Sequence, residues 1–596
     1  MFLRMTKRKK DGKEHRYWSI VENHRVGKTR VIQKHVLYLG EINDSQKEAW
    51  WRAIEVLENG RELPRTMALF PDDRHVHSEN HDVIRVYVNR MRLERPRQWG
   101  ACWLALLLWE HLQLDNYWAV KLRPSRKGTR WLSILKTLVC YRLIQPGSEW
   151  RLHRQWYSNS AIGDLLGEQG EVISYQSLYR CLDKLTKHKK GMFTFLKQRW
   201  QDMFNVGFDV LLYDLTSTYF ECDPPDAGKR RFGYSRDKRP DCVQVVIALI
   251  VTPDGFPLCY EVLAGNTSDR TTLREFLDKI ENQYGKAHRV WVMDRGIPTE
   301  EVLAEMRQSE TPVSYLVGTP KGRLNKLESQ LLSLPWEEVR DSLSVKLLKQ
   351  EGELYVLACS PTRQAKERAM RRRRLKRYWS RLKELQKQKI NRDQLLMKIG
   401  AAKKEAGNTS RLVELTLPLA RQEITPETFR FSINRAKLRV VRRHEGQYLL
   451  RTNLQCEDPA MLWKYYIQLV EVEQAFKTLK SDLSLRPIYH QKDSRIEAHI
   501  FVAFLSYCLQ ITLQQRLKAL APGLTARAVL EKFASMQMVD VYLPTTEGNE
   551  LRLPRYTHPS KEHALLLMKL GLKLPPQPKP ELLNKNSGIT NGALPL

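Results

Sequence analysis

The sequence predicts a multidomain α/β (α+β) protein in which helices flank a mixed sheet. A β-rich insertion with a basic helical arm interrupts this sheet, and a helical region precedes it. Two observations support this class: buried-strand runs alternate with helical patterns over residues 205–320, and within 321–455 strand patterns at 345–360 and 431–454 enclose a basic helical stretch.

The length of 596 residues predicts about three or four domains, each large enough to bury a core. Composition and pattern suggest six segments. These are a small N-terminal β-hairpin and helix unit with a linker (1–85), a helical DNA-binding region (86–204), a first part of the sheet (205–320), the insertion (321–455), a second part of the sheet (456–545) and a partly disordered C-terminal extension (546–596).

The charge indicates a polyanionic partner, most simply nucleic acid, because a surplus of 32 positive charges exceeds what solubility requires. An anionic membrane surface is the rival. No apolar run of about 18 residues and no secretory leader is evident, which favours a soluble protein without a membrane partner. The nine cysteines are scattered and contain no C-x-x-C pair, as expected in the reducing cytoplasm of a bacterium or archaeon.

The first 200 residues contain short strands and then helices. Alternating runs at 17–22 and 35–40 predict a hairpin, followed by a helix over about 45–58 and a linker over 62–85. Helical patterns occupy 103–109, 131–141 and 174–185, with basic residues on exposed faces. They favour a helical module that lies on DNA, and an ordinary helical bundle with solvated lysines is the alternative.

The sheet region changes to the period of buried strands. A run at 208–213 ends in Asp214, and a run at 289–293 ends in Asp294. Between them, two strands flank the turn Pro253-Asp254-Gly255 and so form an antiparallel pair. The remaining elements are the strands at 242–252, 256–263 and 313–318 and the helices at about 269–284 and 299–308.

The insertion contains strands at 345–360 and over 431–454, with a basic helical stretch between them. Residues 363–404 contain 17 Lys and Arg against three acidic residues. A run of this kind is often a solvated helix or a mobile arm. Because it supplies almost half of the net charge, we expect it to contact DNA phosphates, above all through Arg371, Arg372, Arg373 and Arg374.

The helix that follows the insertion is expected to be unbroken over 463–480, because it contains neither Pro nor Gly. Tyr466, Glu473 and Lys480 are seven residues apart and project from roughly one face. Glu471 points elsewhere, so finding Glu471 beside the aspartates would show that this register is wrong. A loop at 486–490, a long apolar helix over 497–513 that covers the sheet, and a disordered tail from about 571 complete the chain.

Asp214, Asp294 and Glu473 are the candidate metal ligands. Side chains at the carboxyl ends of buried strands can leave the core, and two nearby carboxylates repel each other unless a cation neutralises them. A third carboxylate on an adjacent helix allows two Mg²⁺ ions to bind, for which Mn²⁺ can substitute. In the alternative interpretations, Asp214 caps a turn through Thr216 or Ser217, and Asp294 pairs with Arg295.

These residues resemble the three catalytic blocks of DDE insertion-sequence transposases. The blocks are Asp214-Leu-Thr-Ser-Thr218, Val292-Met-Asp-Arg-Gly296 and Tyr466…Glu473…Lys480. The resemblance is to the insertion-sequence-four type, whose ribonuclease-H-like core is split by a β-rich insertion. Its signature is Y-x2-R-x3-E-x6-K, and Leu469 occupies the arginine position here.

The resemblance implies an enzyme that binds the terminal inverted repeats of a DNA element, cleaves its ends by two-metal-ion hydrolysis and joins the 3′-hydroxyl to target DNA by transesterification. It implies a homodimer or a higher synaptic complex on double-stranded DNA. Phosphate contacts would come from Tyr466, Lys480, Lys477 and Arg295.

Two other functions remain open from the sequence. The first is a non-catalytic DNA-binding protein derived from a transposase, which would keep the basic surfaces and be free to lose the carboxylates. The second is another ribonuclease-H-like nuclease, such as a junction resolvase or an RNA/DNA-hybrid hydrolase. Such enzymes are usually shorter and lack a long β insertion.

Overall fold

The computed structural model describes residues 1–40, apart from 11–12 and 27–29, scattered positions between 42 and 84, and residues 86–583 with short gaps. The gaps are 169–172, 226, 238, 268–273, 275–276, 282–288, 295–297, 309–312, 320–326, 328–329, 332–333, 341–342, 421 and 455–457.

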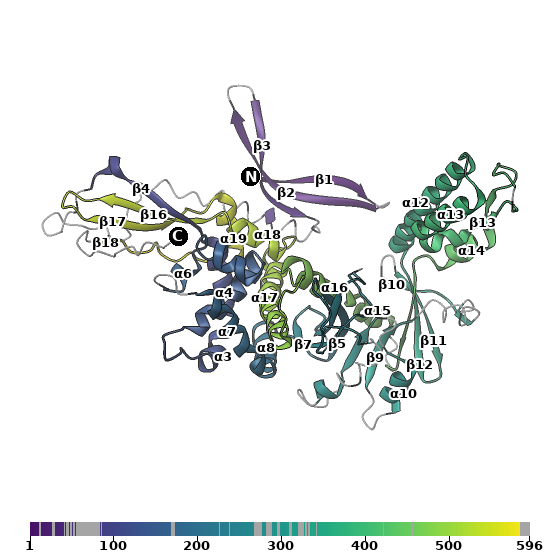
Figure 1. The fold of residues 1–596 in the computed structure, drawn as a ribbon, viewed down its shortest axis with the longest axis horizontal. Helices are drawn as coiled ribbons and strands as arrows, with labels where there is room; N and C mark the ends of the chain where they lie inside the picture. Colours follow the sequence, from purple (N-terminus) through teal and green to yellow (C-terminus); the bar gives the residue numbers. More distant parts are fainter. Residues whose placement is uncertain are drawn as a thin grey trace.

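The N-terminal unit is a three-stranded antiparallel sheet in the order β1-β2-β3 (Figure 1). Its strands are β1 (Phe2–Lys10), β2 (Lys13–Val26) and β3 (Arg30–Gly40). The predicted hairpin is confirmed as β2–β3. Strand β1 was not predicted, because its run of Lys and Arg lacks clear apolar alternation. The predicted helix at 45–58 and the linker at 62–85 lie mostly outside the described residues.

The helical region follows strand β4 (Arg92–Gln98) and confirms the three predicted helices. Four tryptophans, Trp99, Trp109, Trp118 and Trp200, are fully buried in its core. The Ser174 hydroxyl caps α7 by accepting a hydrogen bond from the Ser177 backbone N–H at 3.2 Å. The helices are α2 (Gly100–His111), α3 (Leu114–Lys121), α4 (Trp131–Ile144), α5 (Glu149–Arg151), a π-helical turn (Leu152–Trp156), α6 (Ile162–Leu165), α7 (Tyr175–Leu185) and α8 (Lys189–Phe204).

A mixed sheet forms the centre of the molecule. Five of its strands are β5 (Val210–Phe220), β6 (Val243–Val251), β7 (Pro257–Ala264), β8 (Val290–Met293) and β9 (Ser314–Gly318). They lie in the order β7-β6-β5-β8-β9; β5, β6 and β7 are antiparallel, whereas β8 is parallel to both β5 and β9. Helix α10 (Glu300–Gln308) connects β8 to β9. Only residues 274 and 277–281 of the predicted helix at 269–284 are described, and all of them are helical.

The insertion extends this same sheet. Its strands β10 (Glu337–Arg340), β11 (Leu343–Gln350), β12 (Glu353–Cys359) and β15 (Gln447–Thr452) complete a nine-stranded order of β10-β11-β12-β15-β9-β8-β5-β6-β7. Strand β15 joins the two parts because it pairs antiparallel with both β12 and β9. The insertion therefore forms one continuous sheet with the core strands.

A helical arm projects from the insertion, away from the centre of the molecule (Figure 1). It contains α12 (Pro361–Gln386), α13 (Arg392–Ala406), β13 (Val413–Thr416), β14 (Arg430–Ile433) and α14 (Arg435–His444). A separate apolar core that includes Tyr378, Leu382 and Phe429 holds the arm together. The prediction of strands throughout 431–454 was wrong for 435–444, where the Asn434 side chain caps a helix by accepting from the Lys437 backbone N–H at 2.8 Å.

Helix α17 (Asp493–Leu520) packs against α4 and α7 of the helical region, and in Figure 1 it lies between that region and the central sheet. It is long and apolar enough to cross a membrane by composition, but 94% of its most apolar window is buried inside the protein, as in a core helix. Before it come α15 (Pro459–Ile467), α16 (Leu469–Lys477) and a π-helical turn (Thr478–Asp482).

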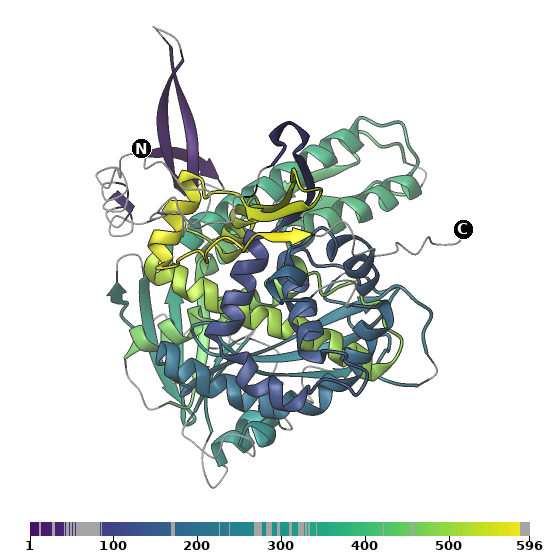
Figure 2. The same cartoon turned by 90° about the vertical axis from the view of Figure 1, so that its left-hand side faces the viewer.

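A separate four-stranded sheet, in the order β18-β17-β16-β4, combines strands that are distant in the sequence (Figure 2). Strands β16 (Gln537–Pro544), β17 (Glu550–Tyr556) and β18 (Glu581–Leu583) follow the core, with α18 (Ala526–Phe533) and α19 (Lys561–Leu570) beside them. The fully buried Asp540 pairs with Arg97 at 2.9 Å and with Arg552 at 3.0 Å. The prediction of a disordered tail from 571 was wrong up to residue 583, because β18 pairs with β17.

Candidate active site

The register between β5 and β8 sets Asp214 beside Asp294. These two strands run parallel, and their last paired residues are Tyr213 and Met293. The next residue on each strand is an aspartate. The prediction that β5 ends at Asp214 was wrong, since the strand continues to Phe220 along β6. Asp214 instead lies where the pairing with β8 stops, which leaves one side of β5 open to a cleft.

The local contacts of Asp214 differ from the predicted alternative. Its Oδ1 accepts a hydrogen bond from the Leu215 backbone N–H at 2.8 Å, rather than capping a turn through Thr216 or Ser217. The Ser217 hydroxyl accepts instead from the Arg236 backbone N–H at 3.2 Å. The possible pairing of Asp294 with Arg295 lies outside the described residues.

The helix expected over 463–480 is broken into α15 and α16, so the prediction of one unbroken helix was wrong. At the break, the Gln468 N–H donates to the Tyr465 carbonyl at 3.2 Å, and the Glu471 N–H donates to the Gln468 carbonyl at 2.8 Å. Both bonds span three residues, which tightens the chain into a turn. Neither Pro nor Gly marks this position. Tyr466 precedes the break and Glu473 follows it.

Asp214, Asp294 and Glu473 line one cleft of about 640 Å³. Tyr466 and Leu469 line it as well, from α15 and α16. The other wall comes from the insertion and the ends of its neighbouring strands, and the remaining lining residues are Gly318, Thr319, Ser360, Arg363, Glu367, Gln447, Tyr448, Leu449, Trp463, Ile467, Val470 and Val472.

The register of α16 is the predicted one. Glu473 faces the cleft, whereas Glu471 lies 4.0 Å from Lys518 of α17, on another side of the helix. Helix α16 packs on β5 and β6, and the burial of Leu469, Val472 and Phe476 fixes this face against the sheet. The apolar stripe therefore determines which glutamate can approach the aspartates.

The carboxylate cleft offers ligand atoms of the kind that a divalent cation takes. Three carboxylates from two strands and one helix line it, and hard cations such as Mg²⁺ take oxygen ligands of this type. Asp294 and Glu473 are exposed, so water molecules and a phosphate group can complete the ligand shell. Asp214, Asp294 and Glu473 are the residues that would hold the ion.

Lys480 lies in a different environment from the one expected. Its Nζ is 2.8 Å from Asp237 Oδ1, and Arg486 forms an ion pair with the same carboxylate. Burial lowers the pKa of Lys480, while Asp237 acts in the opposite direction. Lys480 does not line the cleft, whereas Lys477 is exposed on α16.

Arg363 is a site residue that sequence reasoning missed. It extends from the first turn of α12 into the cleft, where it pairs with Glu367 at 3.0 Å and lies 3.9 Å from the centre of the Tyr448 ring. It supplies a positive charge to the cleft that Leu469 also lines. The only sequence signal was its place at the start of the basic stretch, which does not reveal that α12 begins beside the carboxylates.

The four consecutive arginines of α12 do not share one environment. Arg371 is buried, and its Nε donates to Glu445 at 2.5 Å, so the prediction that it contacts DNA conflicts with its position. Arg372, Arg373 and Arg374 are exposed. Arg372 and Arg373 line a groove of about 800 Å³ on the arm. The other residues that line it are Lys376, Arg377, Ser380, Arg381, Glu384 and Glu405.

Comparison with known families accounts for this arrangement. Residues 209–509 match the transposase DDE domain family. The chain belongs to this family. It is therefore a DDE transposase, an enzyme that acts on DNA ends and uses divalent metal. Residues 3–63 match the N-terminal domain of the IS1634 family transposases.

No curated protein matches the chain. Among solved structures, it is similar to the cryo-EM structure of the piggyBac transposase synaptic complex with hairpin DNA, with 9% sequence identity and a TM-score of 0.34. The similarity covers 72% of this chain and 79% of that chain. A likeness this low adds nothing to the family assignment.

The two glutamates of α16 provide a matched test of the carboxylate site. Glu473→Gln should lower strand cleavage by about a thousandfold or more, because removing a metal ligand removes several kcal/mol of transition-state stabilisation. Glu471→Gln makes the same chemical change two residues away and should leave cleavage nearly unchanged. Cleavage of labelled end DNA measures both, and gel-shift binding should remain in both variants. Equal loss of cleavage in the two variants would contradict the assignment of Glu473.

Proposed function

We propose that this transposase cleaves the ends of a DNA element by two-metal-ion hydrolysis and then joins the freed 3′-hydroxyl to target DNA by transesterification. The observation that carries the proposal is that Asp214, Asp294 and Glu473 line one cleft. We assign the catalytic role to these three carboxylates by their resemblance to the family's blocks, and Mg²⁺ is the ion proposed, with Mn²⁺ as a substitute.

The three carboxylates would hold the metal ions of the reaction. Asp214 and Asp294 come from two adjacent, hydrogen-bonded strands, which set their positions relative to each other. Glu473 approaches from α16. Mg²⁺ ions held there would supply activation of the attacking oxygen and stabilisation of the leaving oxygen.

Positive and polar groups around the cleft position the phosphates. Tyr466 and Arg363 line it, and we assign to Arg363 the phosphate contact that Leu469 cannot make. Lys480 and Arg486 both pair with Asp237, and a phosphate contact from Lys480 remains a proposal. Lys477 and Arg295 remain proposed phosphate contacts.

The helical region and the arm are proposed to grip the terminal inverted repeats, and the protein would act in the cytoplasm as a homodimer or a higher synaptic complex. The insertion-sequence-four grouping is proposed from the Tyr466, Glu473 and Lys480 spacing and the insertion. The N-terminal match instead names the IS1634 family. The domain boundaries drawn from the sequence also remain proposals. The four-stranded sheet crosses them, because it combines β4 with the much later strands β16, β17 and β18.

Metal removal tests the proposed reaction. Purified protein with Mg²⁺ should cut DNA that carries the flanking inverted repeats at the repeat ends, and excess EDTA should abolish the products because the carboxylates alone cannot activate water. Sequencing gels locate the cuts, and added Mn²⁺ should restore them. Stable binding of the repeats with no cleavage under any divalent ion would instead support a non-catalytic DNA-binding protein.

The exposed arginines of the arm should contribute to the salt dependence of DNA affinity. Replacing Arg372, Arg373 and Arg374 by Gln should reduce the salt dependence of DNA affinity by about 0.9 in the log–log slope for each phosphate that is no longer neutralised. Arg371→Gln serves as the contrast. It should lower thermal stability, because the buried Glu445 would keep only Arg368, at 3.8 Å, as a basic partner, and it should leave the slope unchanged. Fluorescence anisotropy titrations across a salt series measure the slopes, and an unchanged slope in the triple variant would exclude phosphate binding by this part of the arm.

A further inference from the structure

A further pocket lies outside the carboxylate cleft, and the two have no lining residue in common. It has a volume of about 620 Å³, within the range of about 300–1,000 Å³ that is typical of small-ligand pockets. It forms where the helical region meets the start of α17. Its lining residues are Ser148, Glu149, Trp150, Tyr175, Tyr179, Tyr489, His490, Gln491, Lys492 and Arg495.

The wall of this pocket contains aromatic side chains that the core does not bury. Trp150 is 53% exposed, Tyr175 is 38% exposed and Tyr489 is 70% exposed. They come from α5, from α7 and from the loop before α17. Because aromatic side chains normally contribute large buried areas to cores and interfaces, three exposed rings that meet at one pocket indicate a surface for a flat, stacking ligand.

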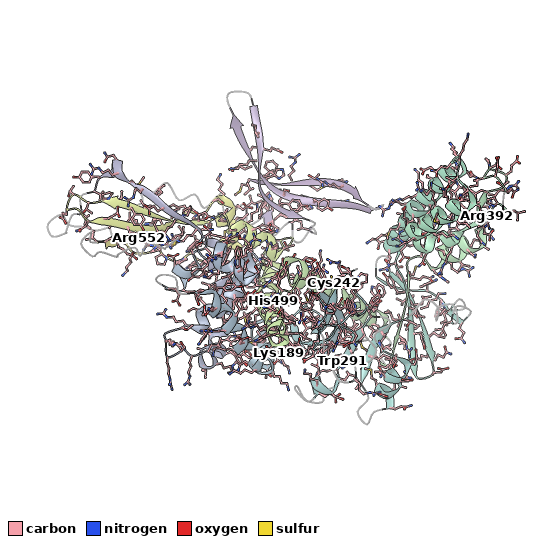
Figure 3. All side chains as sticks on the ribbon, viewed as in Figure 1. Lys189, Cys242, Trp291, Arg392, His499 and Arg552 are labelled. Atoms are coloured by element: carbon pink, nitrogen blue, oxygen red, sulfur yellow. The ribbon has the colours of Figure 1, made fainter. Side chains whose placement is uncertain are left out.

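The floor of the pocket is polar and buried. His490 Nε2 lies 3.4 Å from Glu149 Oε1. The buried His499 of α17, which is labelled in Figure 3, has its Nδ1 at 3.6 Å from the same oxygen. Burial alone would raise the pKa of Glu149, but hydrogen bonds with the two histidines hold it well below its usual value. The floor therefore offers a hydrogen-bonding edge beneath the rings.

This buried group does not suit a metal ion. Arg142 Nη2 lies 3.4 Å from His499 Nδ1, so a positively charged guanidinium already lies beside a nitrogen that a cation would use. Burial lowers the pKa of His499 to about 4, and the Nδ1 of a neutral ring can accept from Arg142 only in the tautomer that does not donate to Glu149 from that nitrogen. The group is a hydrogen-bonded support for the pocket.

The rim of the pocket carries two cationic side chains. Lys492 is exposed, whereas Arg495 lies 5.2 Å from the centre of the Tyr179 ring and is paired with Asp183 at 2.8 Å and 2.9 Å. Stacking rings next to cationic groups are the combination that binds unpaired nucleotides, because every base has a face to stack and every phosphate has a negative charge. Duplex DNA keeps its bases stacked on one another and cannot offer those faces.

We propose that this pocket binds an unpaired nucleotide of single-stranded DNA, with the base against Trp150 and Tyr489 and its phosphate near Lys492. The hydrogen-bonding edge of the base would meet Glu149 and His490. The site goes beyond the proposed cleavage reaction and does not depend on the catalytic carboxylates.

The test compares DNA binding by two surface variants. The probe is a labelled oligothymidylate of about 12 nucleotides, within the usual site size of single-strand binding modules, in buffer with EDTA. The double variant Trp150→Ala, Tyr489→Ala should bind it about tenfold or more weakly than the wild-type protein, because removing each stacking ring weakens binding. Trp51→Ala is the matched control, since Trp51 is 58% exposed and lies outside the pocket.

Further measurements separate stacking from misfolding and from catalysis. Trp150→Phe keeps an aromatic face and should retain most of the affinity, and binding to a duplex of the same length should be the same in all variants. Glu473→Gln should bind the oligothymidylate like the wild-type protein, so failure of the cleavage proposal would leave this result unaffected. Equal affinities of the double variant and Trp51→Ala, or no single-strand binding by the wild-type protein, would overturn the proposal.

Discussion

The parallel pairing of β5 with β8 is the constraint on which the site depends. Backbone hydrogen bonds along the pair fix Tyr213 opposite Met293, and an aspartate follows each of these residues in the sequence. Two like charges side by side are unfavourable unless a cation neutralises them, so the proposed metal ions would offset a cost that this register creates. Strand β8 ends at Met293 while β5 continues to Phe220, and the cleft opens beside the end of β8.

The rest of the structure places the third carboxylate and the groups proposed to contact DNA beside the end of β8. Helix α16 lays its apolar face on β5 and β6, which directs Glu473 into the cleft and Glu471 toward α17. Through β15, the insertion is hydrogen-bonded to β9, so its arm starts at the cleft and carries Arg363 into it. One continuous sheet thus places the carboxylates, the cleft wall and the base of the arm in fixed relation.

Sequence patterns were sufficient for the features that local chemistry determines. The buried strands, the Gly255 turn, the apolar helix α17 and the seven-residue spacing of Tyr466 and Glu473 follow from periodicity and turn residues. Features set by tertiary structure were missed. Strand β5 continues past Asp214 because β6 pairs with it. The helix break at Gln468 has no Pro or Gly to signal it. The insertion strands join the core sheet through a pairing between Leu316 and Thr452, which lie far apart in the sequence. Arg371 is buried because Glu445 lies opposite it, which its identical neighbours do not reveal.

Hydroxyl-radical mapping tests the central claim most directly. Fe²⁺ bound in place of Mg²⁺, with ascorbate and peroxide, cuts the protein backbone next to the ion. The account predicts cuts close to Asp214, Asp294 and Glu473, suppressed by excess Mg²⁺ and absent in Asp214→Asn. Cuts near Glu149, His490 and His499 instead, or cuts unaffected by Asp214→Asn, would contradict it.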